Sequence, residues 1–200
     1  MKNHSIQTQE KSVRKQLNSS IDKKIENGQA IFEQSIHILN EYQSDPLFQA
    51  TQRLLNDADV LMQIAEAKKN CIHAQGWQFE QLEVMKFNMD AVQKEQYGIF
   101  AQTTDSMGQP HAAADILIKN TEGTVLREAQ LKSCNDAANS AFALAVATYE
   151  GMQRIAPSEQ TEKISELYQK RIEAGTLKAQ DYQDAQNHLE KGVQHGEITS

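Results

Sequence analysis

The residues best suited to chemistry are one aspartate, Asp115, and a polar series further along the chain that contains Glu128, Gln130 and Lys132. In this series, polar and apolar residues alternate. Successive side chains of a strand point to opposite faces, so the alternation puts the three polar side chains on one face. Metal-dependent hydrolysis of a phosphodiester uses oxygen ligands for a divalent ion and a cation near the attacking water or the phosphate. The spacing supplies these groups.

Two short strands joined by a turn must position these residues. The apolar run Ile116–Ile118 predicts the first strand, and Val125–Leu131 predicts the second. The intervening residues 119–124 (KNTEGT) include Gly123, which can take the positive φ of a turn. We expect the strands to pair antiparallel, which brings Asp115 to the polar face of the second strand.

At these positions the chain resembles the PD-(D/E)XK nuclease superfamily, and more narrowly its Mrr-like branch, whose last motif reads QxK. That motif is Gln130-Leu131-Lys132 in this chain. The branch also opens its core with a helix that begins G-x-x-F-E, and residues 76–80 read GWQFE, so Glu80 matches the motif glutamate. The resemblance covers residues 76–147. It implies a Mg²⁺ or Mn²⁺ site.

The resemblance implies the catalytic set Asp115, Gln130, Lys132 and Glu80, in which all but the lysine contribute to the metal site. Ala114 precedes the acid where the motif has proline. Gln130 offers a neutral amide oxygen, which is a poorer ligand for a hard cation than a carboxylate. Glu128 lies two residues earlier on the same predicted face and is the secondary candidate for a metal ligand.

Two functions are compatible with this pattern. The first is a metal-dependent endonuclease of restriction or mobile-element type that hydrolyses DNA. The second is a catalytically inactive nuclease-like fold that acts as a binding or assembly module. The net charge of −7 and the pI near 5.4 favour the second, because phosphate contacts come from lysine and arginine. Residues 1–24 nevertheless carry six lysines and arginines against two acids, so they form either a phosphate-binding arm or a solvated helix start.

The periodicity predicts an α+β fold that is mostly helical, in three regions. Residues 1–70 form an N-terminal helical arm, a hairpin of two helices that restarts at Asp45-Pro46 and offers a surface for a homodimer. Residues 76–156 form the nuclease-like core, in the order α-β-β-β-α. Residues 157–200 form a C-terminal helical extension.

Within the core, the predicted elements are a helix over residues 77–94, a strand over 99–101, the two strands described above and a helix over 135–152. In the first helix we expect Leu82, Met85, Met89 and Val92 to form the buried stripe. The extension contains a helix capped by Ser158 and a last helix over 178–191, and the tail GVQHGEITS has no packing signal.

The composition favours a cytoplasmic protein without membrane contacts. The N-terminus has no apolar signal-peptide core, and no run of about eighteen apolar residues occurs. The two cysteines, Cys71 and Cys134, lack the spacing of a zinc site or a disulfide framework. His111 is expected to be a solvated loop residue.

Overall fold

The computed structural model describes residues 43–67 and 74–200 without interruption, together with residues 19, 23, 26, 27, 29–31, 33, 34, 36–38, 40 and 41. The basic tract of residues 1–24 lies outside the described residues except for Ser19 and Lys23. None of the helices in this described part combines the length and the apolar character that a membrane span requires.

The chain divides into two compact units, Met1–Phe48 and Gln49–Ser200. The described residues of the first unit are helical except Asp45, as their periodicity predicts. The Asp45 carboxylate accepts a hydrogen bond from the Leu47 N–H at 2.9 Å, so this residue caps helix α2 (Pro46–Ala67) as expected. The two helices of the predicted N-terminal hairpin fall in different units, so the hairpin stays a prediction.

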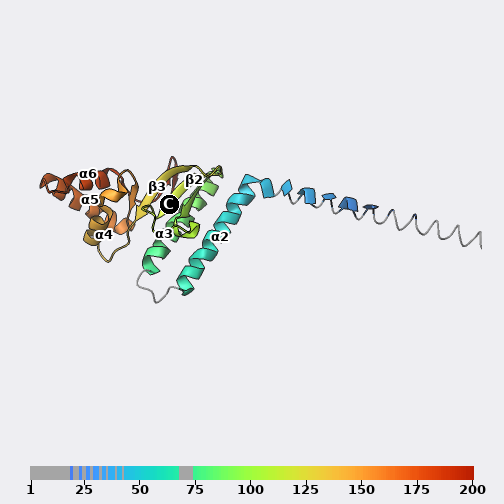
Figure 1. The fold of residues 1–200 in the computed structure, drawn as a ribbon, viewed down its shortest axis with the longest axis horizontal. Coiled ribbons are helices and arrows are strands. Elements are labelled where there is room, and N and C mark those ends of the chain that lie inside the picture. The colour runs from blue at the N-terminus through green and yellow to red at the C-terminus, as the bar shows by residue number, and fades with distance from the viewer. Residues whose placement is uncertain are drawn as a thin grey trace, which may run out of the picture. The chain divides into compact units, whose positions relative to one another are not determined.

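From Gln49 onward, helix α2 belongs to the same unit as the sheet. Helices α2 and α3 (Ala74–Gln93) lie side by side (Figure 1). Asn88 of α3 donates to Asp57 of α2 at 2.7 Å, and Arg53 of α2 donates to the Tyr97 carbonyl at 2.9 Å. Residues 157–200 also belong to this unit. The compact units therefore do not divide at residues 70 and 156, where the sequence pattern had placed domain boundaries, because polar contacts tie these helices to the sheet.

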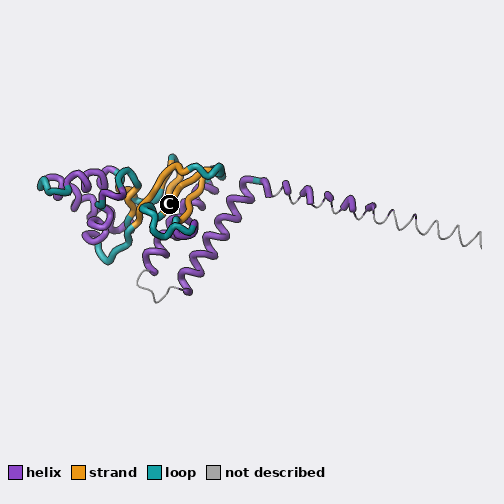
Figure 2. The backbone as a smooth tube through the Cα atoms, viewed as in Figure 1, coloured by secondary structure: helices purple, strands orange, loops and turns teal. Residues whose placement is uncertain are grey.

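The second unit is built on a five-stranded mixed sheet in the order β1-β2-β3-β4-β5. Its strands lie together among the helices (orange in Figure 2). The first three strands pair antiparallel, whereas β4 pairs in parallel with β3 and with β5. The hairpin register puts Ile116 opposite Ala129. The strands are β1 (Ile99–Thr103), β2 (Ile116–Asn120), β3 (Val125–Leu131), β4 (Gln153–Ile155) and β5 (Leu189–Glu190). The observed fold is thus α+β and mostly helical, and the predicted order α-β-β-β-α is present from α3 onward.

Helix α3 covers one face of the sheet, but not with the predicted stripe. Val84, Phe87 and Ala91 are buried against the sheet, while Met89 is 43 % exposed. Asn88 faces the sheet, where its side chain donates to the Ala101 carbonyl and accepts from the Ala101 N–H. Because Val84 and Phe87 lie on the same side of the helix as Asn88, they are the apolar residues that become buried. A polar residue that pairs with a strand edge therefore sets the rotation of the helix.

The predicted helix over 135–152 is wrong in its second half. Helix α4 (Ala137–Leu144) ends early, the short 3₁₀ helix η2 (Ala147–Tyr149) follows, and β4 begins after Gly151, whose φ of 75° favours glycine. Similarly, α6 (Ala179–Asn187) stops short of residue 191 and leads into β5. Helix α5 (Ser158–Glu173) occurs as predicted, although its N-cap is Pro157 and not Ser158.

The C-terminal tail packs on the core, contrary to the sequence-based prediction. Its strands β6 (Gln194–His195) and β7 (Ile198–Thr199) form a small hairpin. Val193 and Ile198 are fully buried in the cluster that contains Phe87, and the Ser200 hydroxyl donates to Glu83 of α3 at 2.6 Å. Two apolar residues in nine gave too weak a periodicity to predict a packed element.

This tail yields a stability prediction. Ile198→Ala should lower the free energy of unfolding by about 3 kcal/mol, because it leaves a cavity beside Phe87. Urea denaturation followed by circular dichroism measures the change. Leu177→Ala is the matched control, since this residue is fully exposed, and it should change little. Equal small effects from both variants would mean that the tail does not close the core.

Candidate functional site

The structure brings Asp115, Gln130 and Lys132 together. Asp115 immediately precedes β2, and Lys132 immediately follows β3. One carboxylate oxygen of Asp115, Oδ2, accepts hydrogen bonds from the Gln130 side-chain amide and, at 2.8 Å, from the Leu131 N–H. The Lys132 ammonium lies 3.7 Å from the same oxygen. The prediction that these three side chains share one face of adjacent strands is confirmed.

The hairpin register explains this convergence. The Asp115 N–H donates to the Ala129 carbonyl at 2.9 Å, and Ala129 is also the ladder partner of Ile116, so the backbone of Asp115 is held against the end of β3 next to Gln130. The segment before Asp115 is anchored as well. Thr104 donates from its backbone to the Asp115 carbonyl at 2.9 Å and from its hydroxyl to the Ala114 carbonyl at 2.9 Å.

Gln130 and Lys132 differ in their access to solvent. Gln130 is only 2 % exposed, and its amide nitrogen also approaches the Leu131 carbonyl at 3.3 Å. Lys132 is partly exposed, as is Asp115. A ligand approaching from solvent would therefore contact the Asp115 carboxylate and the Lys132 ammonium. The buried Gln130 amide donates a hydrogen bond that holds the carboxylate in place.

Burial raises the pKa of Asp115 above its ordinary value. The Lys132 ammonium, the Leu131 N–H and the Gln130 amide act in the opposite direction and offset only part of this effect. The folded protein therefore favours the protonated carboxyl more than water does. A bound cation would favour the ionised carboxylate and offset the effect of burial. Carboxyl groups with a shifted pKa occur frequently at functional sites.

Two residues of this region were missed by the sequence pattern. The ring of Tyr149 lies near two cations: Lys132 Nζ is 5.8 Å from its centroid, and the Arg154 guanidinium carbon is 5.6 Å from it. Arg154 is also the strand partner of Gln130 in the β3–β4 ladder. Tyr149 was missed because residues 135–152 were predicted as one helix, and Arg154 was missed because no strand was predicted after that helix. Gly151 was the signal that the helix must end.

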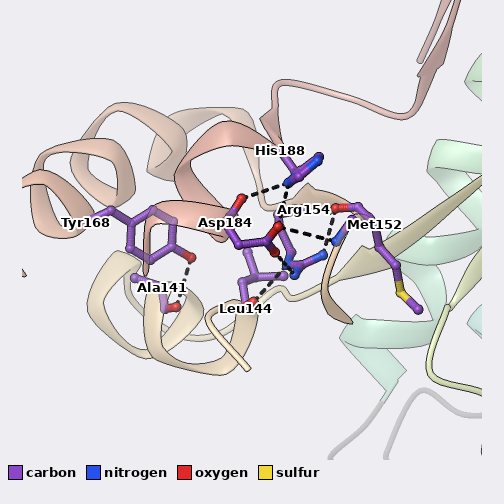
Figure 3. Close-up of polar contacts among 8 residues, drawn as sticks. Ala141, Leu144, Met152, Arg154, Tyr168, Asp184 and His188 are labelled. Atoms are coloured by element: carbon purple, nitrogen blue, oxygen red, sulfur yellow. Dashed lines mark hydrogen bonds and ion pairs between the residues drawn. The ribbon is translucent and has the colours of Figure 1, made fainter. Parts of the chain in front are cut away.

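Arg154 is the centre of a buried polar network (Figure 3). It donates to the carbonyls of Leu144 at 3.0 Å and Met152 at 2.7 Å, and it forms an ion pair with Asp184 at 2.7 Å. His188 Nδ1 lies 3.1 Å from the other oxygen of the same carboxylate. These contacts use the donors of Arg154 within the fold, so we assign this network to structure and not to chemistry.

The two further acidic candidates lie elsewhere. Glu80 lines a cavity of about 380 Å³ with Asp57 of α2, Thr103 of β1 and Asp105 of the 3₁₀ helix η1 (Asp105–Met107). Its helix packs on the face of the sheet that carries Ala129 and Leu131, whereas alternation puts Gln130 on the opposite face. Glu128 is exposed to solvent and pairs with Leu117, one step further along the ladder.

The carboxylates available around Asp115 are therefore few. Within residues 43–67, 74–200 and the described positions before them, no group of three or more histidine, cysteine, aspartate or glutamate side chains is arranged to hold a metal ion. His111 is exposed in the loop before Asp115, as expected. A cation at Asp115 would need ligands beyond the side-chain carboxylates of these described residues.

Comparison with known proteins adds no further constraint, because no protein-family model, curated protein or solved structure matches this chain.

The raised pKa of Asp115 yields a stability prediction with a definite sign. A carboxyl whose pKa is higher in the folded state costs stability once pH rises through the interval between its unfolded and folded values. Asp115→Asn removes this cost and keeps an acceptor for the Leu131 N–H. Its stability relative to wild type should therefore improve as pH is raised from about 3 to about 7.

The matched control is Asp90→Asn, because hydrogen bonding to Lys94 lowers the pKa of Asp90. The ionised Asp90 carboxylate stabilises the fold above its unfolded pKa, and this stabilisation is lost as pH falls. The stability of Asp90→Asn relative to wild type should therefore decrease as pH rises. Denaturation curves at several pH values measure both trends. If Asp115→Asn followed the trend of Asp90→Asn, the attraction of Lys132 would lower the pKa of Asp115 by more than burial raises it.

Proposed function

We propose that this chain is a Mg²⁺-dependent endonuclease that hydrolyses DNA phosphodiester bonds at Asp115 and Lys132. The observation that carries the proposal is the convergence of the Gln130 amide, the Leu131 N–H and the Lys132 ammonium on one oxygen of Asp115. A carboxylate and an ammonium held 3.7 Å apart can engage a cation and a phosphate side by side. The resemblance of the QxK motif to Mrr-like nucleases supports the same reading.

A single carboxylate, that of Asp115, suits a Mg²⁺ ion that is held by the protein and the substrate phosphate together. Mg²⁺ usually keeps several waters and is held by one or two carboxylates plus substrate phosphates. Asp115 supplies one carboxylate, and because its described contacts fall on Oδ2, we assign Oδ1 to the ion. When bound, the ion would polarise the phosphate and lower the pKa of a bound water.

The protein groups take distinct roles in this proposal. Gln130 donates to Asp115, so we assign it to orienting the carboxylate and not to binding the ion. Lys132 neutralises charge that develops on the phosphate oxygens as a water oxygen bonds to phosphorus and the bond to one ester oxygen breaks. Glu80 lines a different cavity and has no step in this chemistry.

The second candidate function is a binding or assembly module with an inactive nuclease-like fold. The specific observation in its favour is that Asp115 Oδ2 already accepts hydrogen bonds within the protein, and that the described residues contain no group of three or more histidine, cysteine, aspartate or glutamate side chains arranged to hold a metal ion. The net charge of −7 also suits a module that does not depend on phosphate contacts. The two candidates differ in what metal ions and Lys132 should do.

Cleavage of supercoiled plasmid tests the nuclease. We expect nicking in Mg²⁺ or Mn²⁺ and none in EDTA. Lys132→Ala should slow cleavage about a hundredfold or more, because it removes a charge aimed at the transition state. Lys163→Ala is the control, since that lysine is exposed on α5, and it should cleave like wild type. A folded wild-type protein that cuts no plasmid in either metal supports the binding module instead.

Gln130→Glu distinguishes the two candidates without an assay of cleavage. The substitution puts a second carboxylate beside Asp115, where two like charges repel unless a cation lies between them. If the ion binds there, Mn²⁺ should raise the melting temperature of Gln130→Glu more than that of wild type. Gln109→Glu, in the exposed loop, should respond like wild type. A destabilised Gln130→Glu that Mn²⁺ does not rescue would argue against a metal site.

A further inference from the structure

Helix α2 carries large apolar side chains on its solvent side. Leu55 is 56 % exposed and Met62 is 62 % exposed, and these residues lie seven positions apart. The same spacing continues back to Phe48 near the start of the helix. A seven-residue repeat of exposed apolar residues on one helix is the pattern of a seam between paired helices.

This stripe lies on the side of α2 that is turned away from its own core. The side that faces the rest of the unit includes Ala50, which is buried, and Arg53 and Asp57, which form hydrogen bonds with it. At about 100° per residue, Asp57 projects about 160° away from Leu55 around the helix axis. The packing of the unit therefore leaves Leu55 and Met62 uncovered.

Small residues flank the stripe with a matching spacing. Thr51 and Ala58 follow the three-and-four alternation that joins them to Leu55 and Met62 into one seam. If a second α2 lies antiparallel across this seam, Leu55 faces Ala58 of the second copy, and Met62 faces Thr51 of the second copy. Each large side chain then meets a small one, which lets the helices approach closely.

The symmetry of the seam identifies its occupant. The antiparallel register described above pairs Leu55 with Ala58 and Thr51 with Met62. The two-fold axis of this register passes between Asn56 and Asp57, which is also the midpoint of α2 (Pro46–Ala67). The two helices would therefore overlap along their whole length of about 33 Å. We propose that α2 forms an antiparallel pair with α2 of a second copy of this chain, through Thr51, Leu55, Ala58 and Met62.

The composition of the seam sets the strength and salt dependence of this dimer. One helix pair buries a small interface, so association should depend on concentration in the micromolar range. Asp59 flanks the seam close to the two-fold axis in both copies, and each chain carries a net charge of −7. Added salt should therefore strengthen the dimer by screening this repulsion, whereas salt would weaken binding to a basic partner.

Sedimentation equilibrium of the full chain tests the proposal. The average mass should rise from the 22.5 kDa of one chain towards twice that value as concentration increases. Leu55→Glu and Met62→Glu should each weaken association about tenfold or more, because dimerisation would bury a carboxylate. Gln63→Glu is the matched control, since it adds the same charge one residue beside the seam without burying a carboxylate, and it should weaken association far less than the two seam variants. At concentrations where wild type is monomeric, the variants should melt like wild type, because the substituted side chains are exposed in the single chain.

Cysteine cross-linking tests the register. In a background where both native cysteines are replaced by serine, a mixture of Leu55→Cys and Ala58→Cys chains should form the disulfide-linked heterodimer fastest. A parallel pair would instead favour Leu55→Cys linked to itself. A wild-type chain that stays monomeric, or a dimer that tolerates both glutamate variants, overturns the proposal. Lower melting temperatures of Leu55→Glu and Met62→Glu without a change in mass would mean that this chain covers the stripe itself.

Discussion

A buried arginine in the sheet holds the second unit together. Arg154 is 1 % exposed, and its guanidinium reaches two backbone carbonyls and the carboxylate of Asp184 on α6. Burial lowers the pKa of Arg154, and Asp184 offsets part of that effect. An unpaired charge in this position would be very costly, so strand β4, the end of α4 and helix α6 must all be in place together. The chain has to complete its C-terminal half before the sheet is stable.

The same arginine connects the structural core with the candidate site. It is the ladder partner of Gln130, and its guanidinium and the Lys132 ammonium both lie near the Tyr149 ring. The site therefore rests on buried, hydrogen-bonded side chains, while Asp115 and Lys132 at the strand ends keep access to solvent. This division suits a binding or catalytic site, because a fixed scaffold lowers the cost of orienting the two charged groups.

The charge of the protein bears on both proposals. A chain with a net charge of −7 gains little from general attraction to DNA, so a nuclease built on it would depend on the metal ion and on a few local cations. In the proposed dimer, a second copy would supply a second set of such cations. The paired α2 helices and the site at Asp115 lie on different elements, so either property can exist without the other.

The sequence by itself determined the hairpin and the convergence at Asp115, because two-residue alternation and a glycine turn are local signals that burial of one sheet face reinforces. It also determined the start of α2, through the Asp45 cap. Only the tertiary structure decided where Glu80 lies, how α3 is rotated and that the tail around Ile198 closes the core. These depend on contacts between residues far apart in the chain, such as Asn88 with the Ala101 backbone and Ser200 with Glu83, and no local periodicity encodes them.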